Sequence, residues 1–446
     1  MIELAERIKR RKISPVEAAE EYLRRISELN PALNAIVTVA PDVMDRARAA
    51  EAAVMRGADL GTDLGALHGV PLTIKDTIET AGLRTTSGSA IRAGYIPTID
   101  ATAVTRLKAA GAIILGKTNP AEMAMDYNAD NPVFGRTNHP QDPALTPGGS
   151  SGGEAAAIAT GMSPGGLGSD LAGSVRIPAH FCGIAALKAT TGRVPGDGQF
   201  PPSTGPYALG AVIGPMARKV GDLRLLFGAL VEEVVSDTDL KGCRFAWYRD
   251  DGVVAVTDET ANAVANAASA LTAAGLIGEE RLPPHVERGN EMWLELFSRA
   301  SVVQLRQVYA GREREGGPFV SWRLQTADDV PPPSLDQYIA AWMERDRLRE
   351  ELLRWLATTP IVIAPVGATP AFKHDTLKVT VRGQTMGTFR AFSYAQTFSV
   401  FDLPVVTVPA GRSPEGLPVG VQIVGRPNAE AMVLTAAEIV EQALSA

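Results

Sequence analysis

Cysteine is scarce in this sequence, with only Cys182 and Cys243 among its 446 residues. Two cysteines cannot form the disulfide framework typical of small secreted proteins, so we expect a reducing compartment. Residues 3–9 carry charges where a signal peptide would need an apolar stretch. The sequence also lacks any run of about 18 apolar residues that could span a membrane. We therefore expect a cytoplasmic protein with no membrane association.

The sequence has no excess of positive charge and few histidines. Its formal net charge is −7, which excludes the basic surface that binding to nucleic acid requires. None of the five histidines follows a metal-ligand spacing such as H-x-x-x-H. We therefore expect no nucleic-acid partner, no metal ion and no cofactor.

Hydrophobic periodicity predicts helices and strands in alternation along most of the chain. Ser14, Pro15 and Glu17 form a helix start with a capping box, and Asn30–Pro31 is expected to end that helix. Such alternation favours an α/β fold with mixed or parallel strands. Strands are predicted at 35–39, 69–76, 112–115, 361–364, 405–408 and 420–424, and helices at 42–56, 100–110, 220–230, 258–274, 290–312, 334–356 and 429–444.

The order of these elements also bears on domain organisation. Predicted strands near both ends of the chain bracket a helix-rich region at 288–356. We therefore expect one interleaved domain over residues 1–446, in which residues 288–356 form a helical cover on the sheet core.

Residues 111–118 (GAIILGKT) fit the letters of a phosphate-binding P-loop. A P-loop follows a strand and opens a helix, whereas here a helix precedes Gly111 and the middle residues are strand-like. The pattern therefore favours a strand that ends in a turn.

Residues 148–153 (GGSSGG) contain the G-x-S-x-G pattern of an α/β-hydrolase elbow twice, centred on Ser150 or Ser151. That elbow needs a strand directly before the serine, but residues 138–147 hold three prolines. His285 and His374 lie in stretches without a supporting pattern. An esterase of this type therefore stays only an alternative.

A third interpretation takes residues 146–179 as one structural unit (TPGGSSGGEAAAIATGMSPGGLGSDLAGSVRIPA). The pattern predicts a Gly/Ser turn, a helix at 154–160, a glycine-rich strand to Ser169 and a tight loop ending at Ser174. The glycines permit close backbone approach and unusual dihedral angles. Such a loop can direct several N–H groups at one point.

This segment resembles the Gly/Ser signature of the amidase signature family. The resemblance extends over most of the chain, with a core signature region at about 69–216, and is carried by 69–76 (GVPLTIKD), 111–119 (GAIILGKTN), 134–137 (FGRT), 181–188 (FCGIAALK), 214–216 and 416–425 (GLPVGVQIVG). It implies a central mixed β-sheet covered on both faces by helices, with a helical cover near the active site. It also implies hydrolysis of C–N bonds in amides, with esters and aryl carbamates (urethanes) as further substrates.

The resemblance implies a Ser, cis-Ser, Lys triad at Ser174, Ser150 and Lys75, with a cis peptide bond before Ser150. Ser174 would be the nucleophile, Ser150 the proton relay and Lys75 the base. Lys75 must then be neutral, although a free lysine has a pKa of about 10.4. Burial among apolar groups would lower that pKa.

The resemblance also assigns the oxyanion hole to the backbone N–H groups of Leu171, Ala172, Gly173 and Ser174. Because residue 172 is alanine where relatives commonly have glycine, we expect an ordinary dihedral angle there. Two charged residues that flank the nucleophile, Asp170 and Arg176, are expected to support the loop as an ion pair.

Substrate-contacting residues are harder to predict. Met125 and Tyr127 align with positions that line the acyl channel in relatives such as fatty acid amide hydrolase. Aromatic residues of the cover could wall a pocket but favour a core position, and they are Trp293, Phe297, Tyr338 and Trp342. No charged residue stands out as a clamp for a carboxylate.

The family also includes one subunit of the glutamyl-tRNA(Gln) amidotransferase complex, which works together with partner subunits. Glu154 and Ala172 stand where that amidotransferase subunit typically has serine and glycine, so we expect a stand-alone amidase with a small-molecule substrate. The sequence leaves homodimer formation open. A catalytically inactive binding protein is disfavoured because all three triad positions are filled.

Overall fold

The computed structural model describes residues 1–60, 64–329 and 331–444. An eleven-stranded sheet runs through its centre in the order β1-β3-β2-β4-β6-β5-β12-β13-β9-β7-β8. In that order the strands are Ile36–Val39, Ile113–Thr118, Pro71–Lys75, Gly165–Asp170, Val212–Ala217, Ala185–Lys188, Val405–Arg412, Pro418–Val424, Ile361–Pro365, Arg244–Trp247 and Ile277–Glu280. Both ends of the chain therefore contribute strands to one sheet.

The sheet is mixed, as the sequence predicts. β2 runs parallel to β3 and β4, and β7 runs parallel to β8 and β9. The other pairings, such as β12 with β5 and β13, are antiparallel. A separate hairpin joins β10 (Lys378–Val381) and β11 (Gln384–Gly387).

Both faces of the sheet are covered, because alternate residues of one strand enter different apolar cores. On β9, Ile361 and Ile363 belong to one core, whereas Val362 and Ala364 belong to the other. Such alternation follows from the two-residue period of a strand. Helices α7 (Val220–Val231), α8 (Asp258–Ala273) and α15 (Glu430–Leu444) contribute to the first core, and α6 (Arg176–Cys182) and α14 (Ser393–Val400) contribute to the second. The predicted fold class is confirmed.

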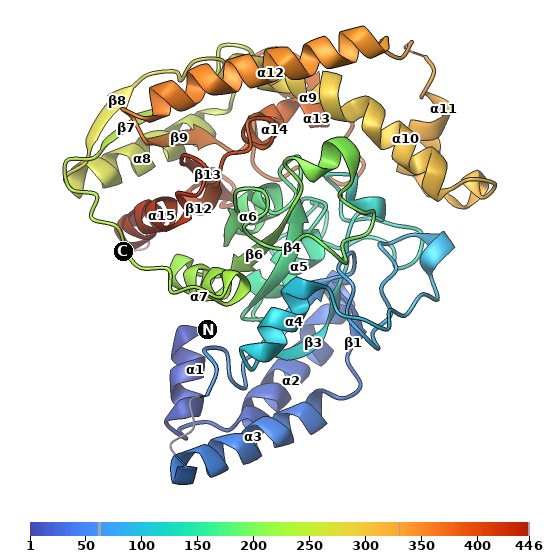
Figure 1. The fold of residues 1–446 in the computed structure, drawn as a ribbon, viewed down its shortest axis with the longest axis vertical. Coiled ribbons are helices and arrows are strands. Elements are labelled where there is room, and N and C mark those ends of the chain that lie inside the picture. Colours follow the sequence, from blue (N-terminus) through green and yellow to red (C-terminus); the bar gives the residue numbers. More distant parts are fainter. Residues whose placement is uncertain (61–63, 330, 445–446) are drawn as a thin grey trace.

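The N-terminal helices α1 (Ile2–Lys9), α2 (Pro15–Leu33) and α3 (Val43–Leu60) lie beside the β1 end of the sheet, with α4 (Thr102–Ala109) close by (Figure 1). The prediction that Asn30–Pro31 ends α2 is wrong, because the helix continues through Pro31 to Leu33. The helix stops at Asn34, which is left-handed at φ 52°. The Asn30 side chain instead accepts from the N–H groups of Ala35 and Ile36, which fixes the start of β1.

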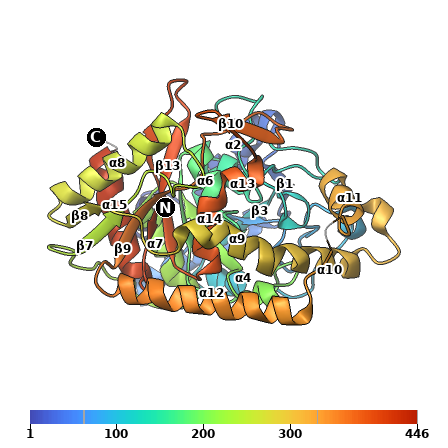
Figure 2. The same ribbon diagram turned by 90° about the horizontal axis from the view of Figure 1, so that it is seen from above.

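The helical cover consists of α9 (Gly289–Trp293), a π-helical turn at Leu294–Ser298, α10 (Arg299–Val308), α11 (Pro318–Gln325) and α12 (Leu335–Leu356). Both views show α12 running alongside α9 and α10 (Figure 1, Figure 2). The predicted helix at 290–312 is therefore interrupted by a π turn and ends earlier, and α11 was not predicted. The single-domain organisation stays a prediction.

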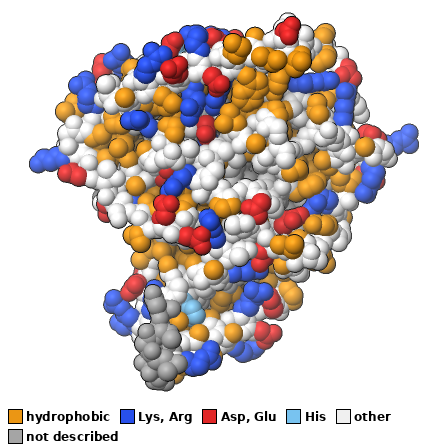
Figure 3. All heavy atoms as spheres, in the orientation of Figure 1, with side chains coloured by type: hydrophobic (Ala, Val, Ile, Leu, Met, Phe, Trp, Pro, Cys, Tyr) orange, Lys and Arg blue, Asp and Glu red, His pale blue; other side chains and the backbone are white. Residues whose placement is uncertain are grey.

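The surface carries both signs of charge. Lys, Arg, Asp and Glu side chains are interspersed over the face seen in Figure 3, as expected for a small net charge. In the part of the chain that the structure describes, no helix combines the length and apolarity needed to cross a membrane.

Candidate active site

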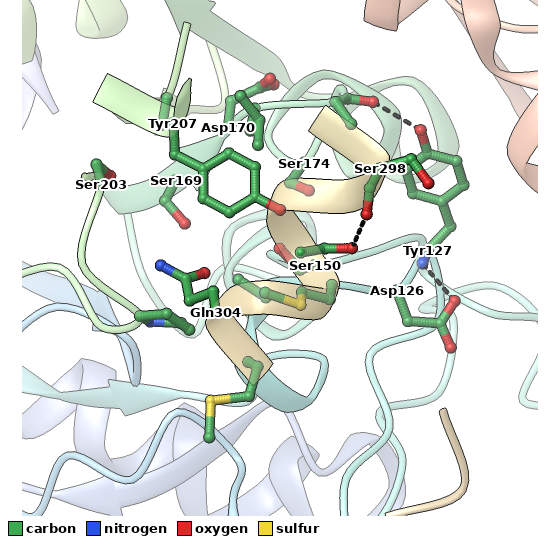
Figure 4. A pocket seen from close by; sticks show the side chains of 18 of the residues that line it. Asp126, Tyr127, Ser150, Ser169, Asp170, Ser174, Ser203, Tyr207, Ser298 and Gln304 are labelled. Carbon is green, nitrogen blue, oxygen red and sulfur yellow. Dashed lines mark hydrogen bonds between the residues drawn. The ribbon is translucent and has the colours of Figure 1, made fainter. Parts of the chain in front are cut away.

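A cavity of about 300 Å³ lies between the signature core and the helical cover. Ser150, Ser169 and Ser174 line it from the core (Figure 4). Trp293 and Arg323 line it from the cover. The size is at the lower end of the range for small-molecule pockets. The cavity brings together residues that lie far apart in the sequence.

Lys75 ends β2, where the strand is enclosed between β3 and β4. Its side chain is fully buried, and Nζ donates hydrogen bonds to Ser150 Oγ at 2.7 Å and Ser169 Oγ at 3.0 Å. Burial lowers the Lys75 pKa to about 7, against the opposing effect of the Asp170 and Glu154 carboxylates. A large fraction of the amine is therefore neutral at neutral pH and can accept a proton.

Ser150 lies in the turn that precedes α5 (Gly152–Ala159), and the Gly149–Ser150 peptide bond is cis, as the resemblance implies. Its hydroxyl accepts from Lys75 and also lines the cavity. This position lets one hydroxyl contact both the amine and a molecule in the pocket.

Ser174 lies in the loop between β4 and α6, and it lines the same cavity as Ser150 (Figure 4). The loop turns at Gly173, whose φ is +106° and where a Cβ atom would lie 2.6 Å from Ala395 Cβ. Glycine is therefore required there. Within the described chain, the Ser174 hydroxyl forms no hydrogen bond, either with Ser150 or with another residue, whereas Ser150 Oγ is bonded to Lys75.

Three of the four backbone amides expected to form the oxyanion hole have no hydrogen-bond partner in the described chain. Gly173 N–H donates to Asp170 Oδ1 at 2.9 Å, so it is already occupied. Within the described chain, the amides of Leu171, Ala172 and Ser174 have no acceptor. Ala172 is absent from the residues with positive φ, in agreement with the expected ordinary dihedral angle.

Asp170 and Arg176 form a fully buried ion pair with an N–O distance of 2.8 Å. Burial raises the pKa of Asp170, but the Arg176 guanidinium and the hydrogen bonds from the backbone amides of Val175 and Gly173 together lower it to about 2. Arg176 also donates to Ala395 O and Gln422 Oε1, both at 2.7 Å. The pair therefore anchors the loop that carries Ser174 to α14 and β13.

Of the residues predicted to contact substrate, Met125 and Tyr127 both line the cavity. Tyr127 stacks on Phe389 with a centroid distance of 5.2 Å. Trp293 also lines the cavity. Phe297 is buried in the core outside the lining, and the half-buried Tyr338 and Trp342 pack against that core.

Sequence reasoning missed a polar wall on the cover. Ser298, Ser301 and Gln304 recur every third residue and face the cavity from one side of the helix. Arg323 Nη2 donates to Ser298 O and Ser298 Oγ, both at 2.6 Å, and within the described chain Arg323 forms no ion pair. Asp126 also lines the cavity, and burial raises its pKa to about 6. The expectation that no charged residue acts as a clamp for a substrate carboxylate stays a prediction. The three-residue spacing of Ser298, Ser301 and Gln304 was a signal that the sequence did contain.

The structure removes the basis of the P-loop interpretation. Residues 113–118 are the buried strand β3, and a loop with a short 3₁₀ turn follows instead of a helix. Lys117 is fully buried and donates to Ile78 O and Thr80 Oγ1. These residues cannot wrap a phosphate.

The structure also contradicts the elbow interpretation. That motif requires a strand directly before the serine, and residues 138–149 contain no strand. The Ser151 hydroxyl is fully buried and does not line the cavity. It donates to Ser169 O and accepts from Ser169 N–H, both at a long 3.4 Å. In the described chain, no group of three or more His, Cys, Asp or Glu residues is placed to hold a metal ion.

Glu154 is a buried carboxylate near Lys75, bonded to Thr73 Oγ1 at 2.5 Å and Thr118 Oγ1 at 2.8 Å. Burial raises its own pKa to about 7, and its negative charge raises the pKa of Lys75. Glu154→Gln removes that charge with little change in shape. We therefore expect the acidic limb of kcat/KM to move to lower pH, because a lower pKa leaves Lys75 neutral in more acidic solution.

The measurement for Glu154→Gln is the pH dependence of kcat/KM between pH 5 and 9. Glu430→Gln is the matched control, because Glu430 is also buried but does not affect the Lys75 pKa. An unchanged limb in Glu154→Gln, or a limb moved to higher pH, would show that this carboxylate does not raise the pKa of Lys75.

Comparisons with known proteins agree with this architecture. The sequence model of the family described as Amidase matches residues 17–434. A glutamyl-tRNA(Gln) amidotransferase subunit from Geobacter metallireducens is 31% identical over 99% of this chain and 96% of that protein. Human fatty-acid amide hydrolase 2 is 30% identical over 99% of this chain and 88% of that protein. A crystal structure of an amidase superimposes with a TM-score of 0.87 at 28% identity, covering 99% of both chains.

The comparisons do not support the expectation that a stand-alone amidase is the better match, because the amidotransferase subunits are at least as similar. Ala172 distinguishes poorly between an amidase and the amidotransferase subunit, because alanine and glycine offer the same backbone amide. What the matches do establish, over nearly the whole chain, is that this protein belongs to the amidase family of amidase-signature hydrolases.

Proposed function

We propose that this chain hydrolyses the C–N bond of small amides through an acyl-enzyme on Ser174. The observation that carries the proposal is the 2.7 Å hydrogen bond between the buried Lys75 amine and the Ser150 hydroxyl, beside a cavity that Ser174 also lines. A lysine with a pKa of about 7 can serve as a base near neutral pH.

In the proposed reaction, Lys75 accepts the proton of Ser150 while Ser150 accepts the proton of Ser174. The Ser174 oxygen attacks the amide carbonyl carbon, and the amides of Leu171, Ala172 and Ser174 stabilise the resulting oxyanion. The protons then return along the same path to the leaving nitrogen, and the C–N bond breaks. Water then attacks the ester carbonyl carbon and gives a proton to Ser150 and Lys75. That proton passes to the Ser174 oxygen as its bond to the acyl carbon breaks, which releases the carboxylic acid.

The cavity supports a substrate with an apolar portion. Trp293, Phe389 and Met125 supply aromatic and thioether surface, while the polar wall around Arg323 offers hydrogen-bond donors. Anilides and other N-substituted amides fit this combination, and esters and aryl carbamates share the same attack at a carbonyl carbon. The homodimer possibility stays a prediction.

A second candidate function is that of the corresponding subunit in a glutamyl-tRNA(Gln) amidotransferase complex, favoured by the 31% identity to the Geobacter metallireducens protein. In that case the chain would act on an amide only together with partner subunits.

One experiment separates the two candidates. The purified chain is assayed alone against anilides, primary amides including glutamine, esters and aryl carbamates, and is also isolated by affinity from its native cells. A stand-alone amidase hydrolyses at least one amide without partners. No hydrolysis by the isolated chain, together with two copurifying proteins that restore glutamine hydrolysis, would favour the amidotransferase role.

A further inference from the structure

The Tyr127 hydroxyl contacts the nucleophile loop directly. Tyr127 is buried, and it lies beside the loop of Ser174 (Figure 4). Its hydroxyl donates to Ala172 O at 2.8 Å and accepts from Gln396 Nε2 at 3.0 Å. A phenol has a single hydrogen, and an amide nitrogen can only donate. The hydrogen of Tyr127 is therefore committed to the Ala172 carbonyl.

The orientation of the Gln396 amide is determined by its other partners. Its Nε2 donates to Phe389 O at 2.9 Å, and its Oε1 accepts from Asn290 Nδ2 at 2.6 Å. A backbone carbonyl accepts only, so the nitrogen must face Phe389 and Tyr127. A chain of hydrogen bonds thus runs from Asn290 on the cover through Gln396 and Tyr127 to Ala172.

The peptide group between Ala172 and Gly173 is held at both ends. Tyr127 binds its carbonyl oxygen, and Asp170 Oδ1 accepts from its N–H at 2.9 Å. Because a peptide group is planar, fixing both ends fixes its orientation. The free amides of Ala172 and Ser174 belong to the two adjoining peptide groups, so their directions depend on this one.

We propose that Tyr127 is a positioning residue for the oxyanion-binding amides of Ala172 and Ser174, held in place by Gln396 and Asn290. This inference rests on the proposed function, since it assigns a task within that reaction. The role differs from the substrate contact predicted for Tyr127, because it acts through the hydroxyl rather than through the ring.

The test is Tyr127→Phe, which removes only the hydroxyl and retains the ring that stacks on Phe389. We expect kcat to fall about 10- to 100-fold, since small misplacements of catalytic groups have effects of that order, with KM within about threefold of wild type. Binding of a trifluoromethyl ketone that forms a tetrahedral adduct should weaken by a similar factor. Binding of an uncleaved amide analogue should not change.

Tyr394→Phe is the matched control. Tyr394 is also buried, and its hydroxyl also donates to a backbone carbonyl, that of Val254, but it does not line the cavity. A general loss of packing would lower the melting temperature of both variants, whereas only Tyr127→Phe should lose kcat.

Wild-type kcat in Tyr127→Phe, or an equal loss of kcat in Tyr394→Phe, would overturn the proposal. So would an equal weakening of the ketone and the uncleaved analogue. None of these outcomes bears on Ser174 as nucleophile, because wild-type turnover and its loss in Ser174→Ala test that role separately.

Discussion

Ser174→Ala should lower kcat for an anilide substrate by about 10⁴-fold or more, the scale seen when the nucleophile of a serine hydrolase is removed. Without the Ser174 oxygen no acyl-enzyme can form. The fold should persist. Within the described chain this hydroxyl forms no hydrogen bond, so its removal leaves no partner unsatisfied, and the smaller alanine side chain fits the buried position. Steady-state kinetics and thermal unfolding of the same preparation give both quantities.

Ser151→Ala is the appropriate control for this variant. Ser151 is adjacent in the signature to Ser150 but lies outside the cavity lining. It should keep kcat within about tenfold of wild type, as expected of a residue away from the chemistry. The reverse pattern, with activity lost in Ser151→Ala and kept in Ser174→Ala, would support the elbow interpretation instead.

Lys75→Met should lower kcat/KM by about 10²- to 10⁴-fold, the usual contribution of a general base. Methionine keeps the apolar stem but leaves Ser150 Oγ and Ser169 Oγ without the amine that bonds them. Lys117→Met is the control, because Lys117 is equally buried in the neighbouring strand yet contacts neither serine. Comparable losses in kcat/KM for both variants, at equal thermal stability, would argue against a specific role for Lys75.

The pH dependence of the wild type follows from the same lysine. Only neutral Lys75 accepts a proton, so kcat/KM should rise with pH through about 7 and level off above it. The rise should vanish in Lys75→Met and persist in Lys117→Met. A wild-type rate that stays constant from pH 5 to 9 would place the base elsewhere.

The lowered pKa also affects stability. The pKa of Lys75 is about 7 in the folded chain and about 10.4 in the unfolded chain. Between these two values the unfolded chain binds one proton more than the folded chain. Lys75 therefore makes the free energy of unfolding increase with pH over this range. Below pH 7 the cost of burying the charged amine is fully present. Urea titrations should therefore show a smaller change in the free energy of unfolding between pH 6 and pH 9 in Lys75→Met than in the wild type. An equal change in both proteins would contradict this expectation.

The α/β fold and most of its elements were predictable, because strands and helices leave different hydrophobic periods in the sequence. The strand that ends at Lys75 and the helix after Ser150 are local features of this kind. The extension of α2 through Pro31 was not, because Asn34 and the contacts of Asn30 decide where that helix ends. The break in the cover helix at Leu294–Ser298 likewise carries no proline or glycine to mark it.

The finer organisation of the site depends on contacts between distant residues. Asp170 Oδ1 accepts a hydrogen bond from the Gly173 amide, and no spacing in the sequence reveals this contact. Gln396 is far from Tyr127 in the chain and meets it only because α14 packs behind the loop that carries Ser174. Arg323 faces the cavity because it is bonded to Ser298 on a neighbouring helix. The family resemblance names residues, but only the folded chain shows which of their atoms remain free to act.

The most direct test of Ser174 as the nucleophile activated through Lys75 is covalent labelling with a fluorophosphonate, followed by peptide mass spectrometry. The reagent reacts with an activated serine hydroxyl, so we predict a single adduct on Ser174 whose formation slows strongly in Lys75→Met. An adduct on Ser151, or undiminished labelling of Ser174 once Lys75 is gone, would contradict this mechanism.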